Sequence, residues 1–209
     1  SHIVEFRNGE SGLHVLHIQT ITEMLLRQLV QKENNRYALS KEQIRMITTA
    51  SALHDIGKIS IPDEILNKPG RLTAEEFAVI KGHSMAGANM LSELPLDQKE
   101  EPLVKTAYEI CRWHHERYDG GGYPDGLKGE EIPVSAQVVA LADVYDALTS
   151  ERCYKYAYSH EKAIEMILAG QCGAFNPLML ECLLDISSSL KKKMGYKSKE
   201  RYEQTVLSD

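Results

Sequence analysis

Histidine and carboxylate side chains recur along this chain at spacings that suit metal binding. Glu10 and His14 are four residues apart, so on a helix both side chains point from one face toward the same place. His54 and Asp55 are adjacent. Neighbouring side chains on a helix diverge by about 100°, so this pair is unsuited to chelating one ion, but its histidine can bind one metal while its carboxylate bridges to a second. A ligand set of imidazoles and carboxylates favours iron or manganese, with zinc as an incidental occupant.

Three further segments carry potential ligands. His83 lies within a predicted helix, His114 and His115 end another helix, and Asp143 lies in an otherwise apolar helical segment, where a buried carboxylate is costly unless it is paired or bound to metal. Each residue alone has a simpler explanation, such as a hydrogen-bonded core histidine or a salt-bridged aspartate. Their presence together in one helical chain favours a metal site.

The elements that would position these residues are predicted to be helices throughout. Apolar residues at helical spacing predict a first helix over residues 9–31. Capping boxes at Ser40/Gln43 and Thr73/Glu76 predict the starts of two more, one leading into His54 and one ending near Leu94. Later helices are predicted from near Pro102 to His114 and over residues 135–148, 159–168 and 177–193. The fold class is therefore a single all-α domain.

Two segments between these helices are predicted to be loops. Residues 59–71 contain two prolines and a glycine, and residues 119–133 contain five glycines and two prolines. A loop of the second length in a compact domain is usually functional. We expect it to form one wall of the cleft that holds the ligand.

Composition excludes several classes of function. The chain has 209 residues and a formal net charge of -6, so it has no general attraction for duplex nucleic acid or anionic membranes. No apolar run is long enough to insert into a bilayer. Its four cysteines never form a C-x-x-C pair, which is typical of free thiols in a reducing cytoplasm.

The ordered motifs of this chain resemble those of the HD-GYP family, a group of helical, metal-dependent phosphodiesterases. The matching segments are Glu10-Ser11-Gly12-Leu13-His14, His54-Asp55-Ile56-Gly57-Lys58, Ile61-Pro62-Asp63, Lys68-Pro69-Gly70, the run from His114 through Gly122-Tyr123-Pro124, and Asp143 to Lys155. The resemblance covers roughly residues 10–177. One departure is His17, which stands where relatives often have arginine and is expected to be a non-ligand, with a role behind His14 left open.

The resemblance also implies a role for each site residue. One metal would be bound by His14, His54, Asp55 and Asp143, and a second by Asp55, His83, His114 and His115. Glu10 matches a carboxylate that holds a third metal in some members, so two or three divalent ions, iron or manganese, are expected. Asp55 and Lys58 would be the catalytic residues, with Lys58 also touching substrate phosphate. The other expected substrate contacts are Tyr123, Arg152 and Lys155.

The activity implied by this resemblance is hydrolysis of cyclic di-GMP to the linear dinucleotide pGpG, and then to GMP. Two cations that share a water lower its pKa and present hydroxide to the phosphorus. Two alternatives stay open. One is an HD phosphohydrolase acting on another cyclic dinucleotide, such as cyclic GMP-AMP, or on a nucleotide. The other is a catalytically silent sensor of cyclic dinucleotides.

The same resemblance suggests how the domain is placed in a longer protein. Residues 1–9 are interpreted as a linker from an upstream region, residues 10–193 as the HD-GYP domain and residues 194–209 as a polar C-terminal extension. A receiver or sensory domain is the expected upstream partner. The sequence leaves a homodimer through the first helix open, although burial of that helix within the domain is favoured.

Overall fold

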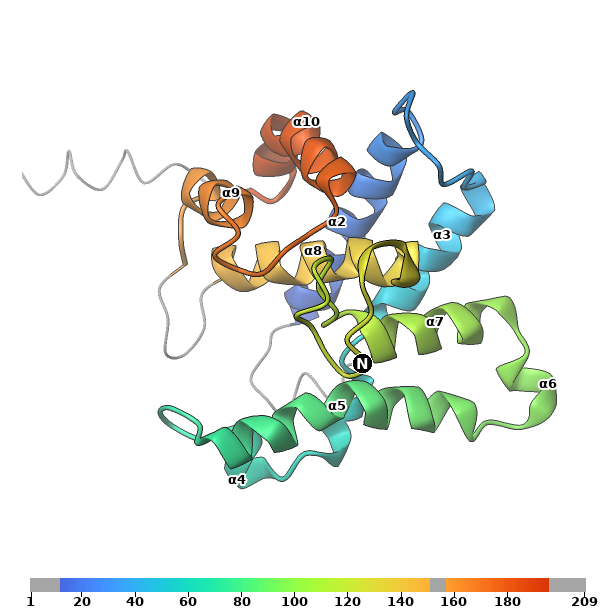
Figure 1. Cartoon of the computed structure of the whole chain (residues 1–209), viewed down its shortest axis with the longest axis vertical. Helices are drawn as coiled ribbons and strands as arrows, with labels where there is room; N and C mark the ends of the chain where they lie inside the picture. Colours follow the sequence, from blue (N-terminus) through green and yellow to red (C-terminus); the bar gives the residue numbers. More distant parts are fainter. Residues whose placement is uncertain (1–11, 151–156, 196–209) are drawn as a thin grey trace, which may run out of the picture.

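Helices make up all the regular structure of the described chain. The computed structural model describes residues 12–150 and 157–195, and no strand occurs among them (Figure 1). The predicted all-α fold is therefore confirmed. The α-helices are α2 (Gly12–Leu29), α3 (Lys41–Ala50), α4 (Asp63–Leu66), α5 (Ala74–Ser92), α6 (Leu96–Lys99), α7 (Pro102–Trp113), α8 (Val134–Thr149), α9 (His160–Leu168) and α10 (Pro177–Lys193), and the 3-10 helices are η1 (Ser51–Leu53), η2 (Ile56–Ser60) and η3 (Gly129–Glu131).

Local side-chain signals set where several of these helices begin. Ser40 caps α3 and Thr73 caps α5, and in both cases the full capping box predicted from the sequence is present. Pro102 occupies the first turn of α7, where its missing N–H costs nothing. The Ser159 hydroxyl accepts a hydrogen bond from the backbone N–H of Lys162 at the start of α9.

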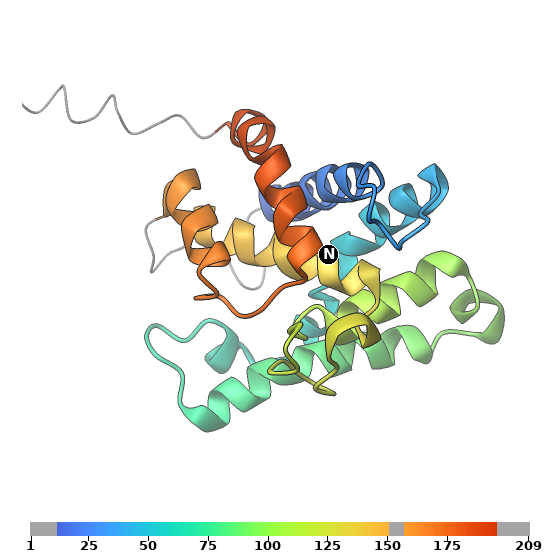
Figure 2. The same ribbon diagram turned by 45° about the horizontal axis from the view of Figure 1, so that its top comes forward.

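Helix α8 lies at the centre of the molecule. It packs against α2, α7 and α9, and Figures 1 and 2 both show α10 on one side of it and the α5–α7 pair on the other. Leu141 and Tyr145 of α8 are fully buried, as are Leu25 of α2 and Ile110 of α7. Because α8 is covered on several sides, it can be apolar almost all round. A polar residue such as Asp143 on this helix therefore marks a place where the core opens toward a site.

The segment between α3 and α5 differs from the sequence prediction. Helix α3 ends at Ala50, the chain continues through η1 and η2, and part of the predicted loop forms the short helix α4. The cause is a close backbone contact. A Cβ atom on Gly57 would lie 1.9 Å from the carbonyl oxygen of His83 and 2.4 Å from the backbone nitrogen of Gly87. Helix η2 therefore lies directly on α5, which a regular continuation of α3 would not allow.

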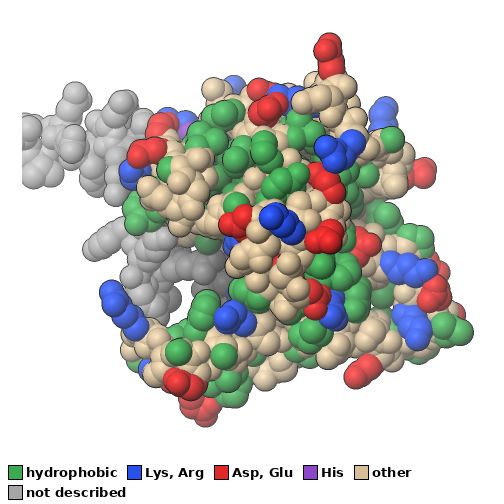
Figure 3. All heavy atoms as spheres, in the orientation of Figure 1, with side chains coloured by type: hydrophobic (Ala, Val, Ile, Leu, Met, Phe, Trp, Pro, Cys, Tyr) green, Lys and Arg blue, Asp and Glu red, His purple; other side chains and the backbone are tan. Residues whose placement is uncertain are grey.

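The surface carries charges of both signs. Figure 3 shows acidic and basic side chains interspersed on one face, with hydrophobic side chains scattered among them and almost no histidine surface. Among the described residues, no helix combines the length and the apolarity that a membrane crossing needs. Cys111 and Cys182 are free thiols, in agreement with the sequence prediction for these two.

Candidate metal centre

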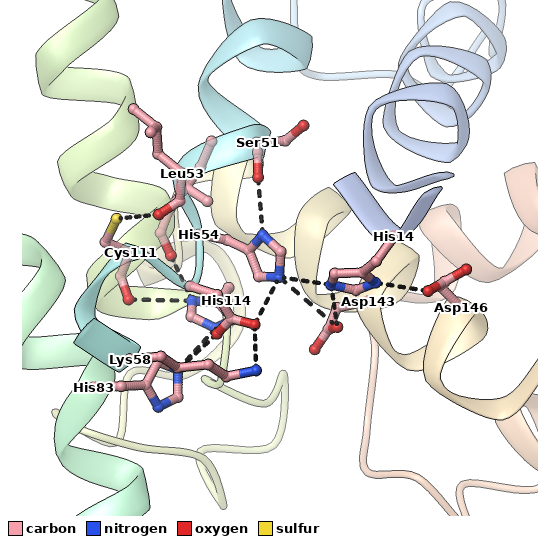
Figure 4. A network of polar contacts seen from close by, with 12 residues as sticks. His14, Ser51, Leu53, His54, Lys58, His83, Cys111, His114, Asp143 and Asp146 are labelled. Carbon is pink, nitrogen blue, oxygen red and sulfur yellow. Dashed lines mark hydrogen bonds and ion pairs between the residues drawn. The ribbon is translucent and has the colours of Figure 1, made fainter. Parts of the chain in front are cut away.

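The described histidines and carboxylates predicted to bind metal come together in two adjacent groups. Within each group one ligand atom per residue lies within 4.8 Å of the others. The first group is His14, His54 and Asp143, and the second is Asp55, His83, His114 and His115. The rings of His54 and His114 are 5.3 Å apart, centroid to centroid, so the two groups form one continuous site. Figure 4 shows five of these side chains converging from α2, the end of η1, α5, the end of α7, and α8: His14, His54, His83, His114 and Asp143.

Asp55 lies between the two groups and faces both. Its Oδ2 is 3.2 Å from Nε2 of His54 in the first group, and its Oδ1 is 3.2 Å from Nε2 of His83 in the second. The residue follows η1 at a break between two 3-10 helices, so the chain turns between His54 and Asp55 instead of continuing one helix. This geometry fits the expectation that Asp55 bridges two ligand groups.

Hydrogen bonds on the outer side of the site orient the imidazole rings. In three histidines the Nδ1 atom donates to a backbone carbonyl three or four residues earlier in the chain, and a carbonyl can only accept. These bonds are His54 to Ser51 at 2.9 Å, His83 to Ile80 at 2.7 Å and His114 to Ile110 at 2.8 Å. With the proton on Nδ1, each of these rings in its neutral form presents the lone pair of Nε2 to the centre, as metal-binding histidines do.

A carboxylate orients His14 in the same way. Asp146 is almost fully buried, and its two oxygens accept from Nδ1 of His14 and Nδ1 of His17, each at 2.7 Å. His17 therefore lies behind His14 and outside the ligand groups. Asp146 was not predicted as a site residue. The signal that could have found it is its spacing, since it lies three residues after Asp143 and so near the same face of α8.

The distances between the ligand atoms test whether a cation fits. Nε2 of His83 lies 3.4 Å from Nε2 of His114 and 3.2 Å from Nε2 of His115, and Nε2 atoms of His14 and His54 are 3.4 Å apart. Lone pairs that face each other this closely repel unless a cation lies between them. Oδ1 of Asp55 is also buried without a well-formed hydrogen bond from the described residues. The donor set therefore fits divalent metal ions, which HD domains bind.

The charges within the site shift its pKa values in opposite directions. Burial acts to lower the pKa of His54, but the Asp55 and Asp143 carboxylates outweigh it and raise that pKa to about 9. Burial lowers the pKa of His114 to about 3, with His54 and His83 acting in the same direction. Burial also acts to raise the pKa of Asp55, but Lys58 and His54 lower it well below its ordinary value. His114 is thus a neutral imidazole, the form that binds metal.

Two predicted substrate contacts lie beside these groups. Nζ of Lys58 is 2.7 Å from Oδ2 of Asp55, so this lysine points at the bridging carboxylate (Figure 4). The ring of Tyr123 stacks on the ring of His115, with centroids 4.8 Å apart and planes at 23°. Both side chains therefore adjoin the place where a ligand of the metal groups would lie.

Glu116 fixes the glycine-rich loop next to the site. Its side chain is almost fully buried, and its Oε1 accepts from the backbone N–H groups of Asp125 at 2.8 Å and Gly126 at 3.1 Å. A Cβ atom on Gly122 would lie 2.4 Å from the Cα atom of Glu116, so only glycine fits there. Glu116 lies in the run from His114 to Pro124 that resembles the family motif, but no role was predicted for it. Its position directly after two ligand histidines was the available signal.

Some predicted site residues lie outside the described part of the chain. Glu10, the expected ligand of a third metal, precedes the first described residue. Arg152 and Lys155, expected to contact substrate, fall in the gap between residues 150 and 157. Their roles stay predictions.

Comparisons with known proteins agree with this geometry. The family model described as "HD domain" matches residues 12–175. A probable cyclic di-GMP phosphodiesterase of Vibrio cholerae is 42% identical over 188 residues, which cover 87% of this chain and 42% of the relative. A 3'3'-cGAMP-specific phosphodiesterase of the same organism is 38% identical, over 87% of this chain and 32% of the relative. The chain thus spans less than half the length of either relative.

A solved structure supports the same fold. Bd1817, an HDG"Y"P protein from Bdellovibrio bacteriovorus, superposes with a TM-score of 0.61 at 22% identity, over 83% of this chain and 51% of that one. The helical architecture is therefore shared well beyond the level of sequence identity. With the family match over residues 12–175 and the motifs that form the two ligand groups, this chain belongs to the HD domain family, in the HD-GYP group that its motifs indicate.

Proposed function

We propose that this domain is a metal-dependent phosphodiesterase that hydrolyses cyclic di-GMP to linear pGpG, and pGpG further to GMP. One observation carries the proposal: the two oxygens of Asp55 face two groups of imidazoles, 3.2 Å from His54 on one side and 3.2 Å from His83 on the other. A carboxylate shared by two ligand groups can hold two cations close together, and two such cations can hydrolyse a phosphodiester.

The metal ligands proposed are the seven described residues of the two groups, with Glu10 as a ligand for a third ion. Iron or manganese suits five imidazoles mixed with carboxylates, and zinc is an incidental occupant. When bound, the ions supply a water of lowered pKa and neutralise the charge that builds on the phosphate. The Nδ1 hydrogen bonds keep the rings oriented before substrate arrives, so little reorganisation is needed.

The remaining residues of the site would act on the substrate directly. Lys58 lies 2.7 Å from Asp55. Its ammonium is therefore close enough to reach a phosphate that the metal ions would bind next to the bridging carboxylate. Tyr123, stacked on His115, offers its exposed edge and hydroxyl to a base or ribose. Arg152 and Lys155 are proposed to contact the dinucleotide from the segment that follows α8. A receiver or sensory domain upstream would control the activity in a longer protein.

A second cyclic dinucleotide competes as the substrate. The relative that is 38% identical is named a 3'3'-cGAMP-specific phosphodiesterase, and the ligand groups alone do not discriminate between bases, since they bind phosphate. We favour cyclic di-GMP because the relative with 42% identity carries that name.

The test is a chromatographic turnover assay on protein prepared without oxygen and loaded with iron or manganese. Cyclic di-GMP and 3'3'-cGAMP are supplied separately at equal concentration, and pGpG is followed as a further substrate. The expected result is faster linearisation of cyclic di-GMP. Faster turnover of 3'3'-cGAMP would contradict cyclic di-GMP as the preferred substrate and identify 3'3'-cGAMP in its place. Metal-loaded protein that hydrolyses neither compound would refute the phosphodiesterase and support a sensor.

A further inference from the structure

Arg117 follows His114, His115 and the loop-fixing Glu116 in the sequence and belongs to neither ligand group. Its Nη1 atom donates to the carbonyl oxygen of Glu116 at 3.0 Å, with a longer contact of 3.5 Å to the carbonyl of His114. In the described part of the chain, Nε and Nη2 donate to no acceptor, and no carboxylate forms an ion pair with this guanidinium. Arg117 is thus a cation with most of its donors unused.

The surroundings of Arg117 hold it in place and cover part of it. The guanidinium carbon lies 5.4 Å from the centre of the Phe175 ring. The backbone of Gly173 packs so closely on the other side that an added Cβ atom would lie 2.5 Å from Nε. Burial lowers the pKa of Arg117, although the group stays charged at any physiological pH. A partly desolvated charge that forms no ion pair is costly, and such groups persist mainly where a ligand supplies the missing partner.

Arg117 lies beside the proposed active site, because it follows His115 by two residues and its Nη1 is 3.5 Å from the carbonyl oxygen of His114. The groups that act most on its charge are Asp143, a residue of the first ligand group, and Tyr123, which stacks on His115 of the second. Both sit at the place where the proposed substrate would bind. The anionic parts of a cyclic dinucleotide are its two phosphodiesters, and the planar fork of a guanidinium matches two oxygens of one phosphate.

We propose that Arg117 binds a phosphate of the cyclic dinucleotide through the guanidinium donors that have no partner in the described chain. This inference rests on the proposed function, because it takes its ligand from that function. It adds a substrate-binding residue to those expected from the sequence, on the side of the site that faces Phe175 and Gly173. The fixed side chain loses little conformational freedom when the phosphate binds.

The test compares Arg117→Met with Arg117→Lys and with Arg45→Met. Methionine keeps an unbranched stem that can pack on Phe175 and Gly173 but removes the charge and donors. Lysine keeps the charge without the planar fork. Arg45 is an exposed arginine of α3, away from both ligand groups, and is the matched control. Binding of cyclic di-GMP to metal-depleted protein is measured by calorimetry, together with KM and kcat of metal-loaded protein, metal content and melting temperature.

The proposal predicts that Arg117→Met weakens binding and raises KM by about tenfold or more, that Arg117→Lys has an intermediate effect, and that Arg45→Met has none. Metal content and melting temperature stay at wild-type values. Wild-type binding by Arg117→Met, or a loss of metal or of melting temperature that accompanies weaker binding, would overturn it in favour of a structural role. If the wild type binds cyclic di-GMP without hydrolysing it and Arg117→Met weakens that binding, the proposed function fails while this inference stands.

Discussion

The orientation of single side chains in this site depends on atoms that face away from it. Asp146 illustrates the point, because its two oxygens accept from both His14 and His17 at 2.7 Å. A carboxylate can only accept, so Nδ1 of His14 and Nδ1 of His17 are the donors, and each uses a different oxygen of Asp146. The carboxylate thereby fixes which nitrogen of His14 faces the first ligand group, although it belongs to neither group itself.

Replacement of Asp146 by asparagine should therefore weaken metal binding without removing a ligand. Asparagine has one oxygen for two donors, so one histidine loses its acceptor and His14 loses a charged partner. We expect metal affinity to fall by about 10–100-fold, measured by titration against a competing chelator. Asp97→Asn, on the exposed surface of α6, is the control and should bind metal as the wild type does. Equal affinities for the two variants would show that Asp146 does not orient His14.

At the level of elements, the site depends on how closely η2 lies on α5. Gly57 provides this contact, since its Cα lies against the backbone of His83 and Gly87. The contact brings Asp55 and Lys58, on either side of Gly57, next to His83. Two consecutive short helices therefore position the bridging carboxylate, and a backbone contact sets their distance from the second ligand group.

Gly57→Ala should separate η2 from α5. The added Cβ would lie 1.9 Å from a carbonyl oxygen, so we expect a loss of at least the ~1–3 kcal/mol typical of overpacked sites, together with lower metal content. Gly82→Ala is the matched control, because it lies on the same helix α5 with no atom within 4 Å of its added Cβ. That change should leave stability unchanged or raise it slightly. The melting temperature reports stability and elemental analysis reports metal content. If Gly57→Ala and Gly82→Ala gave similar values of both, the close contact between η2 and α5 would be contradicted.

The sequence could predict the elements that depend on neighbouring residues, but not those that depend on contacts between separate helices. Helix starts at Ser40, Thr73 and Pro102 were predictable because each depends on residues within one turn. The 3-10 helices around His54 were not, because their position depends on the contact of Gly57 with α5, which lies beyond the local sequence. In the site, motif residues indicated which histidines and carboxylates come together. Glu116 and Asp146 act through hydrogen bonds to residues elsewhere in the chain. Glu116 binds the backbone of Asp125, nine residues away, and Asp146 binds His14, 132 residues away. Sequence spacing alone does not reveal such contacts.

On the scale of the whole molecule, helices packed around α8 hold the site together. One link lies away from the metal groups: His160 of α9 is 2.7 Å from the hydroxyl of Tyr145 in α8 and 2.8 Å from that of Ser187 in α10. A neutral ring satisfies both contacts, since one nitrogen donates and the other accepts.

We also propose, from the extent of the fold, that residues 10–193 form one domain, with residues 1–9 as a linker and residues 194–209 as an extension.

His160 should make stability depend on pH. Burial lowers its pKa below the ordinary value, opposed by Glu161 and assisted by Lys191. The unfolded chain therefore binds the proton more readily than the folded one, and the contribution of His160 is fully present above about pH 6.5 and lost as pH falls below it. Melting temperatures of wild type and His160→Gln, measured from pH 7.5 to 5, should converge at low pH. Parallel curves would show that His160 does not contribute this dependence.

The central claim is that Asp55 joins two metal sites whose ions perform the hydrolysis. The most direct measurement is metal content and cyclic di-GMP turnover in the same samples of wild type and Asp55→Ala, both prepared without oxygen in iron or manganese. The account predicts at least two metals per wild-type chain with turnover, and a loss of metal together with all turnover in Asp55→Ala. Turnover by a wild type that holds one metal or none, or turnover that survives in Asp55→Ala, would contradict it.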